Sequence, residues 1–391
     1  NVDGGMEINL DKIKCDDIVK ILFAENPGVV IQVADKHKSE VKKILEDAGV
    51  GYVKIGVPTE ERHILATFHD ATYQFGIDYL RDVWYSTSYL LDRKQSMNGC
   101  AKKRFENYKQ QPLEFVFDKS FTGKLSQFGL DPNRRTPSGI KAAIIREKGT
   151  NGEREMAYML YLAGFDVKDV TMTDLVSGRE TLEDINMVVY CGGFSNSDVL
   201  GSAKGWAGSF LFNPKAKAAL DNFYAREDTL SLGVCNGCQL MMELGLITPE
   251  DKKKGKMLHN DSHKFESAFL GVTVPMNRSV MFGSLSGSKL GIWVAHGEGK
   301  FSLPYPEDHY NVVLKYSYDE YPGNPNGSDY SVAGIASQDG RHLAMMPHLE
   351  RACFPWENAY YPLDRKNEDQ ITPWMEAFVN ARKWVEANRK K

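Results

Sequence analysis

The segment from Gly233 to Gln239 (GVCNGCQ) constrains the fold of this chain more than any other part of the sequence. The residues before it, 229–234, form an apolar run bounded by turn residues and predict a buried strand. The residues after it, 239–244, are almost all good helix formers. A strand that enters a helix through one residue flanked by glycines makes a sharp corner, and the side chain at that corner projects outward. The pattern therefore predicts an α/β domain with Cys235 at such a corner.

Cys235 is a candidate nucleophile, because the first-turn amides and the dipole of a helix stabilise a thiolate at the helix N-terminus. Other interpretations stay open. A free cysteine is most often a small buried hydrophobe, and Cys235 with Cys238 has the spacing of a redox pair or of half a zinc site. The other four cysteines are scattered and form no second Cys-x-x-Cys, so we expect no metal site.

Length and composition limit the remaining possibilities. A chain of 391 residues is long enough for two or three domains. A net charge of −4 offers no basic surface for nucleic acid, and no apolar run approaches the ~20 residues that cross a bilayer. Six cysteines without regular spacing indicate a reducing, cytoplasmic setting. The sequence begins without Met, which suggests a fragment.

The first third of the chain predicts a small α+β unit followed by a helix and a linker. Strands are expected at 29–33 and 52–57, with a helix at 38–48 between them. The helical stretch at 78–110 carries an apolar stripe, and we expect this face to pack on a core. Residues 118–138 contain glycines and prolines without periodicity and predict a linker. The expected domains are therefore 1–77, 78–138 and 139–391.

From residue 139 onward the pattern alternates between strands and helices, which predicts a parallel sheet covered by helices, with its sites at the carboxyl ends of the strands. Residues 265–348 are rich in strands and include a hairpin around 338–341. Trp374 begins a final amphipathic helix. Before the strand-rich part, strands are expected at 142–145, 167–172, 187–190 and 229–234, and helices at 153–163 and 215–224.

A thiol nucleophile needs a base and a group that orients the base. His348 follows an apolar strand, and Glu350 lies two residues later, on the same face of an extended segment. Acyl transfer also needs amide donors for an oxyanion. The amide of Asn236, directly after the nucleophile, is one candidate, and Gly193 in a Gly-Gly turn after the strand at 187–190 is the other.

A second glycine-rich segment follows the apolar strand at 290–295. His296, Gly297 and Glu298 precede Gly299, and the glycines would let the backbone approach a small ligand closely. An ordinary hairpin turn explains the same residues.

The combination of Gly233-x-Cys235-x-Gly237 with a later His348-x-Glu350 resembles the triad class of glutamine amidotransferases. The surrounding sequence is similar to the long, single-chain phosphoribosylformylglycinamidine synthase family. Residues 22–33 resemble the end of that family's second synthetase half, and 139–391 resemble its glutaminase domain. The motifs that carry this resemblance are CGGFSNSDVL at 191–200, GVCNGCQ at 233–239, AHGEG at 295–299, NPNGS at 324–328 and PHLER at 347–351.

The resemblance implies a fold and a set of roles. The fold would be a flavodoxin-like parallel sheet flanked by helices with additional antiparallel strands, preceded by part of an α+β synthetase domain, like that of aminoimidazole ribonucleotide synthetase, and a helical linker. Cys235 would attack glutamine, His348 oriented by Glu350 would transfer the proton, and the amides of Gly193 and Asn236 would hold the oxyanion. The residues that bind glutamine would be Gln239, His296, Gly297 and Glu298.

The resemblance also implies partners. Ammonia would travel through a channel to synthetase domains that use ATP and magnesium to convert formylglycinamide ribonucleotide to its amidine in purine biosynthesis, whereas the glutaminase domain itself would need no cofactor. The chain departs from the family in two ways. Leu349 replaces an expected proline, and the N-terminal part is only a piece of the synthetase.

We therefore expect the glutaminase end of such a synthase, which by itself hydrolyses glutamine slowly at best. Two alternatives remain at this point, namely another cysteine hydrolase of similar architecture and a non-catalytic docking module.

Overall fold

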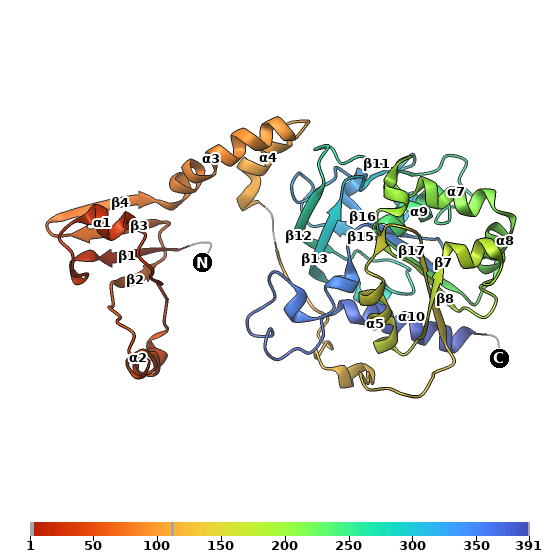
Figure 1. Cartoon of the computed structure of the whole chain (residues 1–391), viewed down its shortest axis with the longest axis horizontal. Helices are drawn as coiled ribbons and strands as arrows, with labels where there is room; N and C mark the ends of the chain where they lie inside the picture. The colour runs from red at the N-terminus through yellow and green to blue at the C-terminus, as the bar shows by residue number, and fades with distance from the viewer. Residues whose placement is uncertain (1–3, 111–112, 390–391) are drawn as a thin grey trace. The chain divides into compact units, whose positions relative to one another are not determined.

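The structure is a computed structural model that describes residues 4–110 and 113–389. It contains two compact units, one ending at Asp92 and the other beginning at Arg93 (Figure 1). The junction lies inside helix α3 (Ile77–Gln95). The three-part division predicted at residues 77 and 138 stays a proposal.

The first unit contains a four-stranded sheet with the order β2-β1-β3-β4. Strand β1 pairs in parallel with β3 and antiparallel with β2, and β3 and β4 form a hairpin. Its small core is built on Leu10, Ala66 and Phe68. The elements are β1 (Gly5–Asn9), α1 (Ile18–Phe23), α2 (Lys38–Asp47), β2 (Gly56–Thr59), β3 (His63–Phe68) and β4 (Ala71–Gly76).

Three expectations for this region differ from the structure in whole or in part. Residues 29–33 form no strand, and Val29 and Val30 are 86% and 74% exposed. The expected strand at 52–57 is present only in its last residues, where β2 begins. The apolar stripe on α3 is exposed as well, with Trp84 at 78%. A pattern of apolar residues shows which face is apolar, but a strand or a buried face also needs a surface to pack on, and the side chains of Val29, Val30 and Trp84 remain exposed.

The second unit contains a nine-stranded sheet whose order is β13-β12-β15-β16-β17-β10-β8-β5-β7. The last five strands are parallel. Numbered along the chain, these five have the spatial order 2-1-3-4-5, which is the flavodoxin-like order predicted from the sequence. They are β5 (Lys141–Arg146), β7 (Asp166–Thr171), β8 (Met187–Tyr190), β10 (Leu230–Val234) and β17 (His342–Met345).

The other four strands of this sheet are antiparallel and confirm the predicted strand-rich region. They are β12 (Glu266–Thr273), β13 (Lys289–His296), β15 (Asn311–Tyr316) and β16 (Val332–Ala336). Strands β16 and β17 form the hairpin expected around 338–341, where Gly340 adopts a positive φ of 76°. Two short ladders lie outside the sheet: β6 (Thr150–Asn151) with β9 (Gly192–Gly193), and β11 (Lys256–Leu258) with β14 (Lys300–Ser302).

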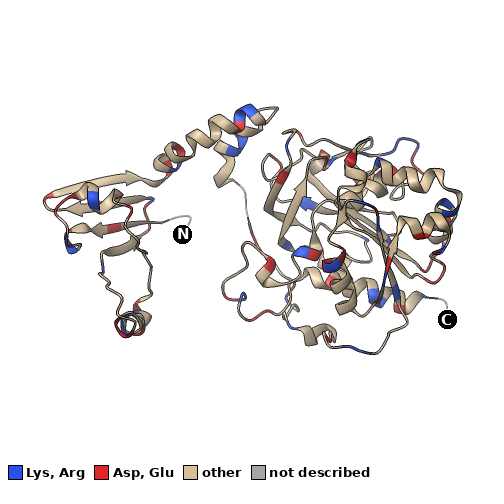
Figure 2. Cartoon of the chain, in the orientation of Figure 1, with Lys and Arg blue, Asp and Glu red and all other residues tan. Residues whose placement is uncertain are grey.

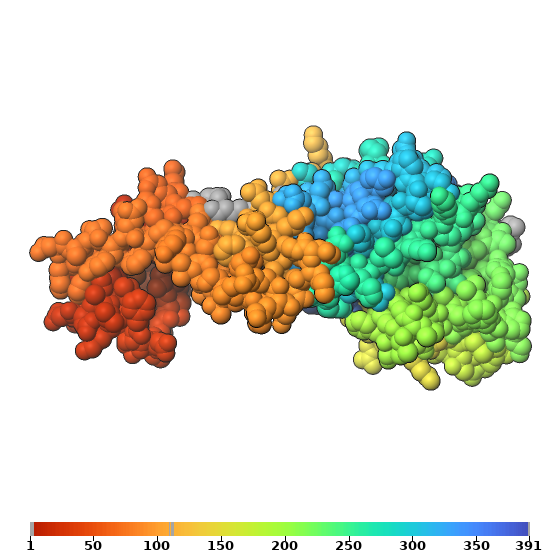
Figure 3. Space-filling model, turned by 90° about the horizontal axis from the view of Figure 1, so that it is seen from above, coloured from red at the N-terminus to blue at the C-terminus, as the bar shows by residue number. Residues whose placement is uncertain are grey.

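Helices cover both faces of this sheet. Helix α5 packs against α10 on one side, whereas α7 contacts both α8 and α9 on the other (Figure 1). Segments far apart in sequence, such as those around 200–225 and 260–340, share one face of the unit (Figure 3). The helices are α4 (Cys100–Glu106), α5 (Glu153–Ala163), α6 (Met172–Ser177), α7 (Lys204–Phe212), α8 (Pro214–Ala225), α9 (Asn236–Glu243) and α10 (Trp374–Asn388).

The segment interpreted as a linker, 118–138, packs on this second unit. Leu125, Phe128 and Leu130 contact the main hydrophobic core. The backbone amide of Leu125 donates to the side chain of Gln370 at 3.0 Å. The irregular sequence of 118–138 therefore does not indicate a free linker. Single apolar side chains attach the segment to the core of the second unit, although most of it forms neither helix nor strand.

Acidic and basic residues alternate along the chain in both units (Figure 2). This distribution agrees with the small net charge of −4. Among the helices within the described residues, none combines the length and the apolar character needed to span a bilayer.

The corner between β10 and α9 depends on Gly237. A Cβ at this position would lie 2.0 Å from the carbonyl oxygen of Tyr190 in β8, so the backbone would have to move. We expect Gly237→Ala to lower the free energy of unfolding by about 2–3 kcal/mol or more, as overpacking does in a close-packed interior. Urea denaturation measures this change.

Gly208→Ala is the matched control, since Gly208 lies in helix α7 and its added Cβ would have only ordinary contacts, the nearest with Phe212 at 3.7 Å. This variant should change stability by at most about 1 kcal/mol, because alanine is the better helix former. Equal effects of the two substitutions would contradict the importance of the corner.

Candidate active site

Cys235 lies between the last residue of β10 and the first residue of α9, as the sequence predicts. Its backbone has φ 54° and ψ −108°, a conformation that is costly for a residue with a side chain and persists only where the surroundings enforce it. Its N–H donates to the carbonyl of Met345 at 2.9 Å, and its carbonyl accepts from Gln239 N–H at 3.0 Å. The strained corner is thus fixed on both sides by backbone hydrogen bonds.

The expected base and its orienting carboxylate lie together. His348 Nδ1 and Glu350 Oε1 are 2.6 Å apart, and the two side chains are buried. The His348 N–H donates to the carbonyl of Trp293 in β13 at 2.9 Å. Leu349, which replaces the expected proline, is fully buried and holds the segment by packing.

Strand pairing brings His348 to Cys235. Strands β10 and β17 run in parallel with Val234 opposite Met345, so both residues follow the same edge of the sheet. A Cβ placed on Gly192 would lie 2.8 Å from His348 Cε1 and 3.3 Å from Cys235 Cβ. Both side chains therefore converge on Gly192. The Cys235 thiol donates to the carbonyl of Ala295 at 3.5 Å.

The protonation of His348 is set by two opposing effects. Burial alone lowers the pKa of this imidazole, but the Glu350 carboxylate and the contact with Cys235 outweigh burial and raise the pKa to about 10. Because Nδ1 is hydrogen-bonded to Glu350, Nε2 is the ring nitrogen that can exchange a proton with another group.

The Gly-Gly turn lies beside the corner. Gly193 belongs to β9, which pairs with β6, and its φ of 115° is accessible only to glycine. A Cβ on Gly193 would lie 2.5 Å from the carbonyl oxygen of Gly149. Gly193 lines the same pocket as Cys235. The amide of Asn236 belongs to the first residue of α9, where helix N–H groups have no partner within the helix.

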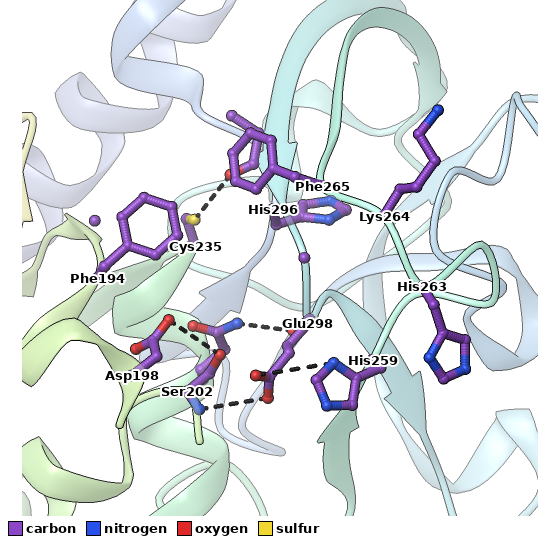
Figure 4. Close-up of a pocket in the computed structure, with 14 residues that line it drawn as sticks. Phe194, Asp198, Ser202, Cys235, His259, His263, Lys264, Phe265, His296 and Glu298 are labelled. Carbon is purple, nitrogen blue, oxygen red and sulfur yellow. Dashed lines mark hydrogen bonds and ion pairs between the residues drawn. The ribbon is translucent and has the colours of Figure 1, made fainter. Parts of the chain in front are cut away.

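A pocket of about 220 Å³ opens at Cys235 (Figure 4). The four residues predicted to bind glutamine, Gln239, His296, Gly297 and Glu298, all line it. Phe194 and Phe265 belong to its wall, with ring centroids 5.9 Å apart. The volume lies below the ~300–1,000 Å³ of pockets for drug-sized ligands and suits a single amino acid.

A chain of hydrogen bonds connects the corner to the loop after β13. The Asn236 side chain accepts from Ser195 N–H at 3.0 Å and donates to Gln239 Oε1 at 2.9 Å. The Gln239 amide then donates to the carbonyl of Glu298 at 2.7 Å. The side chain of Gln239 therefore lines the pocket and also holds the backbone of the pocket wall at Glu298.

His296 is a buried histidine with no hydrogen-bond partner for either ring nitrogen among the described residues. Burial, with a smaller effect of nearby His348, lowers its pKa to about 3. The ring is therefore neutral at physiological pH and presents one donor and one acceptor.

Sequence reasoning missed several pocket residues. Asp198 and Ser202 follow the Gly-Gly turn, and His259, His263 and Lys264 come from the segment before β12. The position of Asp198, five residues after Gly193 within the CGGFSNSDVL motif, was the available signal. The other residues carry no pattern that points to the site, since only the fold brings them to it.

A structural metal centre needs several His, Cys, Asp or Glu side chains in one place. No group of three or more His, Cys, Asp or Glu side chains in 4–110 and 113–389 could hold a metal ion.

We expect Glu350→Gln to lower the pKa of His348, because the substitution removes the carboxylate and leaves the burial that disfavours the imidazolium. Histidine NMR across pH measures this shift. His342 serves as the internal reference, since its pKa of about 4 reflects burial elsewhere and should not move.

The same pair predicts a pH-dependent stability. The folded pKa of His348 is raised, so the stabilisation is complete below the pKa of the unfolded histidine, ~6.5, and disappears as the pH rises through about 10. Glu350→Gln should therefore destabilise the protein at pH 6 and less so at high pH. An unchanged titration of His348 would contradict this electrostatic account.

The sequence and fold have relatives among known proteins. Residues 139–385 match the family of CobB/CobQ-like glutamine amidotransferase domains. The chain is 38% identical over 94% of its length to phosphoribosylformylglycinamidine synthase of Homo sapiens. It is 37% identical over 98% of its length to the probable chloroplastic/mitochondrial enzyme of Arabidopsis thaliana. The structure of PurLQS from Thermotoga maritima is 27% identical, with a TM-score of 0.49 over 63% of this chain and 99% of that one.

The match covers only part of these relatives. The chain spans 29% of the human protein and 28% of the Arabidopsis protein. The family match, in contrast, covers more than half of the chain and includes the corner, the Gly-Gly turn and the His348 segment. The chain belongs to the CobB/CobQ-like glutamine amidotransferase family.

Proposed function

We propose that this chain hydrolyses glutamine to glutamate and ammonia through a thioester on Cys235. The observation that carries the proposal is the convergence of Cys235 and the buried His348–Glu350 pair on Gly192, next to a pocket of amino-acid size. A nucleophile, a base and an orienting carboxylate in this relation form the arrangement that acyl transfer requires.

In the proposed reaction the proton of the Cys235 thiol passes to His348 Nε2, and the sulfur attacks the side-chain amide carbon of glutamine. The amide N–H groups of Gly193 and Asn236 stabilise the oxyanion that forms on the amide oxygen. His348 Nε2 delivers a proton to the leaving nitrogen, the C–N bond breaks and ammonia departs. Water then attacks the thioester, His348 accepts a proton from the water, and glutamate leaves with regeneration of the thiol.

The pocket residues have separate roles in this proposal. Glu298 and Gly297 bind the amino-acid end of glutamine, and neutral His296 supplies a donor or an acceptor that no protein group uses. Gln239 keeps the 296–298 loop in place relative to the nucleophile, because its amide bonds the Glu298 carbonyl.

The relatives indicate the wider context. They are named phosphoribosylformylglycinamidine synthase, and the chain spans less than a third of their length. We propose that the ammonia passes through a channel to a synthetase part outside this sequence, which uses ATP and magnesium to form formylglycinamidine ribonucleotide in purine biosynthesis. A cytoplasmic location is part of the proposal, since all six cysteines are free thiols.

We expect an electrophilic glutamine analogue, such as its chloromethyl ketone, to form one covalent adduct on the wild-type chain, and Cys235→Ala to abolish it. Mass spectrometry of the intact chain and its peptides locates the adduct. Cys15→Ala is the control, because Cys15 is the one thiol of the chain that is not buried. An adduct that survives Cys235→Ala would refute the assignment, and turnover of peptides or esters without glutamine would favour another cysteine hydrolase.

We also expect the isolated chain to release glutamate from glutamine more slowly than the full-length protein from the same source does when supplied with ATP and its nucleotide substrate. The reason is that coupling to a synthetase part would be needed to assemble the complete site. A coupled glutamate assay on both proteins measures the difference. Equal rates would contradict the dependence on the synthetase.

A further inference from the structure

The segment just before strand β12 forms one wall of the pocket at Cys235 (Figure 4). Asn260 attaches this segment to the loop after β13. Its backbone N–H donates to the Gly297 carbonyl at 2.9 Å, and its side-chain amide donates to the His296 carbonyl at 2.7 Å. We call residues 259–265 the wall turn. Four of its side chains line the pocket, namely those of His259, His263, Lys264 and Phe265.

A buried carboxylate directly follows the wall turn. It belongs to Glu266, the first residue of β12. Its Oε1 atom accepts from the Ser262 hydroxyl at 2.5 Å and from the Tyr321 hydroxyl at 3.0 Å. Its Oε2 atom accepts from the Arg104 guanidinium at 2.9 Å. Removal of one partner from a buried ion pair is strongly destabilising, because the remaining charge is left uncompensated. The position of Glu266 beside the wall turn therefore depends on Arg104.

Arg104 belongs to helix α4, and the residues before this helix contact the wall turn as well. The Met97 N–H donates to the Ser262 carbonyl at 2.9 Å. The Asn98 side-chain amide donates to the Asp261 carbonyl at 2.8 Å. The segment from 97 to 104 thus holds the wall turn at two backbone carbonyls and, through the ion pair, at the strand that follows the turn.

Helix α4 is separated from α3 only by residues 96–99. Because α3 contains the junction between the two compact units, α4 is the first helix that lies wholly in the second unit. The chain that leads into the second unit is therefore attached at the pocket wall before it reaches β5, the first strand of the large sheet.

We propose that Arg104 is a positioning residue for glutamine binding. Its ion pair with Glu266 holds the wall turn in place and thereby keeps the pocket at the size of its substrate. A shift of α4 moves the wall turn and changes the affinity for glutamine, while the nucleophile at Cys235 keeps its geometry. This inference rests on the proposed function and deepens it, since it places the control of substrate binding in a helix outside the pocket.

The test labels Cys235 in the full chain with two reagents. One is the chloromethyl ketone analogue of glutamine, which occupies the pocket, and the other is iodoacetamide, which is too small to need the wall turn. In each case the Cys235 sulfur displaces the halide and forms a C–S bond, and the thiol proton passes to His348. Mass spectrometry follows labelling at increasing concentrations of the analogue, which separates its half-saturating concentration from its maximal rate.

Arg104→Met keeps most of the side chain's length and removes its charge. We expect it to raise the half-saturating concentration of the analogue roughly two- to thirtyfold, the range for residues that act on a site without contact to the ligand. The maximal rate and the rate with iodoacetamide should stay unchanged, because the substitution leaves the nucleophile and its base in place.

Glu266→Gln added to Arg104→Met should restore the wild-type half-saturating concentration. No buried charge is then left unpaired, and an amide oxygen at this position still accepts from Ser262 and Tyr321. Packing that is lost with the Arg104 side chain is not repaired by a change at Glu266. The rescue therefore separates the ion pair from a merely structural role of Arg104.

Arg365→Met is the matched control. Arg365 pairs with the buried carboxylate of Asp369 at 2.8 Å, and its guanidinium lies over the Phe117 ring, 5.1 Å from the centroid. Arg104 likewise pairs with a buried carboxylate and lies over the Tyr321 ring, 4.9 Å from the centroid. Because the Arg365 pair lines no part of the pocket, its loss should keep the wild-type half-saturating concentration.

The outcomes separate this inference from the proposed function. If the analogue does not label Cys235 in preference to the other thiols, the proposed function fails and the inference fails with it. If the wild-type chain is labelled and Arg104→Met keeps the wild-type half-saturating concentration, the function stands and the positioning role is overturned. Absence of rescue by Glu266→Gln, or an equal effect of Arg365→Met, overturns it as well.

A second variant decides the question if Arg104→Met does not fold. Arg104→Lys keeps the charge and loses the planar fork of the guanidinium. It should raise the half-saturating concentration by a smaller factor than expected for Arg104→Met, and no rise at all overturns the inference.

Discussion

The close contact between the β10–α9 corner and strand β8 is the constraint on which the site depends. Gly237 lies against the carbonyl of Tyr190 with no room for a Cβ, so the first turn of α9 approaches the sheet as a bare backbone. This contact accompanies the costly φ and ψ of Cys235, whose buried side chain lines the pocket. The energy stored in one residue is offset by the packing of the whole β8–β10–β17 layer.

Burial is the second physical condition. His348 and Glu350 are buried. In the protein interior the attraction between an imidazolium and a carboxylate is far stronger than at a surface. Desolvation lowers the pKa of His348, and the short contact with the Glu350 carboxylate outweighs this effect. His296, which is close enough to His348 to be affected by its charge, is also buried but has no carboxylate partner and is neutral. Two histidines in one site therefore differ in charge because only one of them has an acidic partner.

One end of the pocket carries Cys235, and the other carries the carboxylates of Asp198 and Glu298. The chain of hydrogen bonds from Asn236 through Gln239 to Glu298 links the two ends rigidly, so the helix that presents the nucleophile also sets the position of the far wall. A small substrate with an amide at one end and a charge at the other matches such a pocket. The structure thus connects the reactivity of Cys235 and the shape of its site through the same turn of α9.

The sequence alone determined the parts of the protein that local chemistry controls. Glycine spacing identified the corner at Cys235, periodicity predicted most strands and helices after residue 139, and motif order gave the family. It failed at residues 29–33, which form no strand, and on the α3 stripe, whose apolar side chains are exposed. Only the tertiary structure joined Asp198 to Glu298 and left His296 without a hydrogen-bond partner. These relations arise from strand order and loop packing, which bring distant segments together and leave no periodic signal in the sequence.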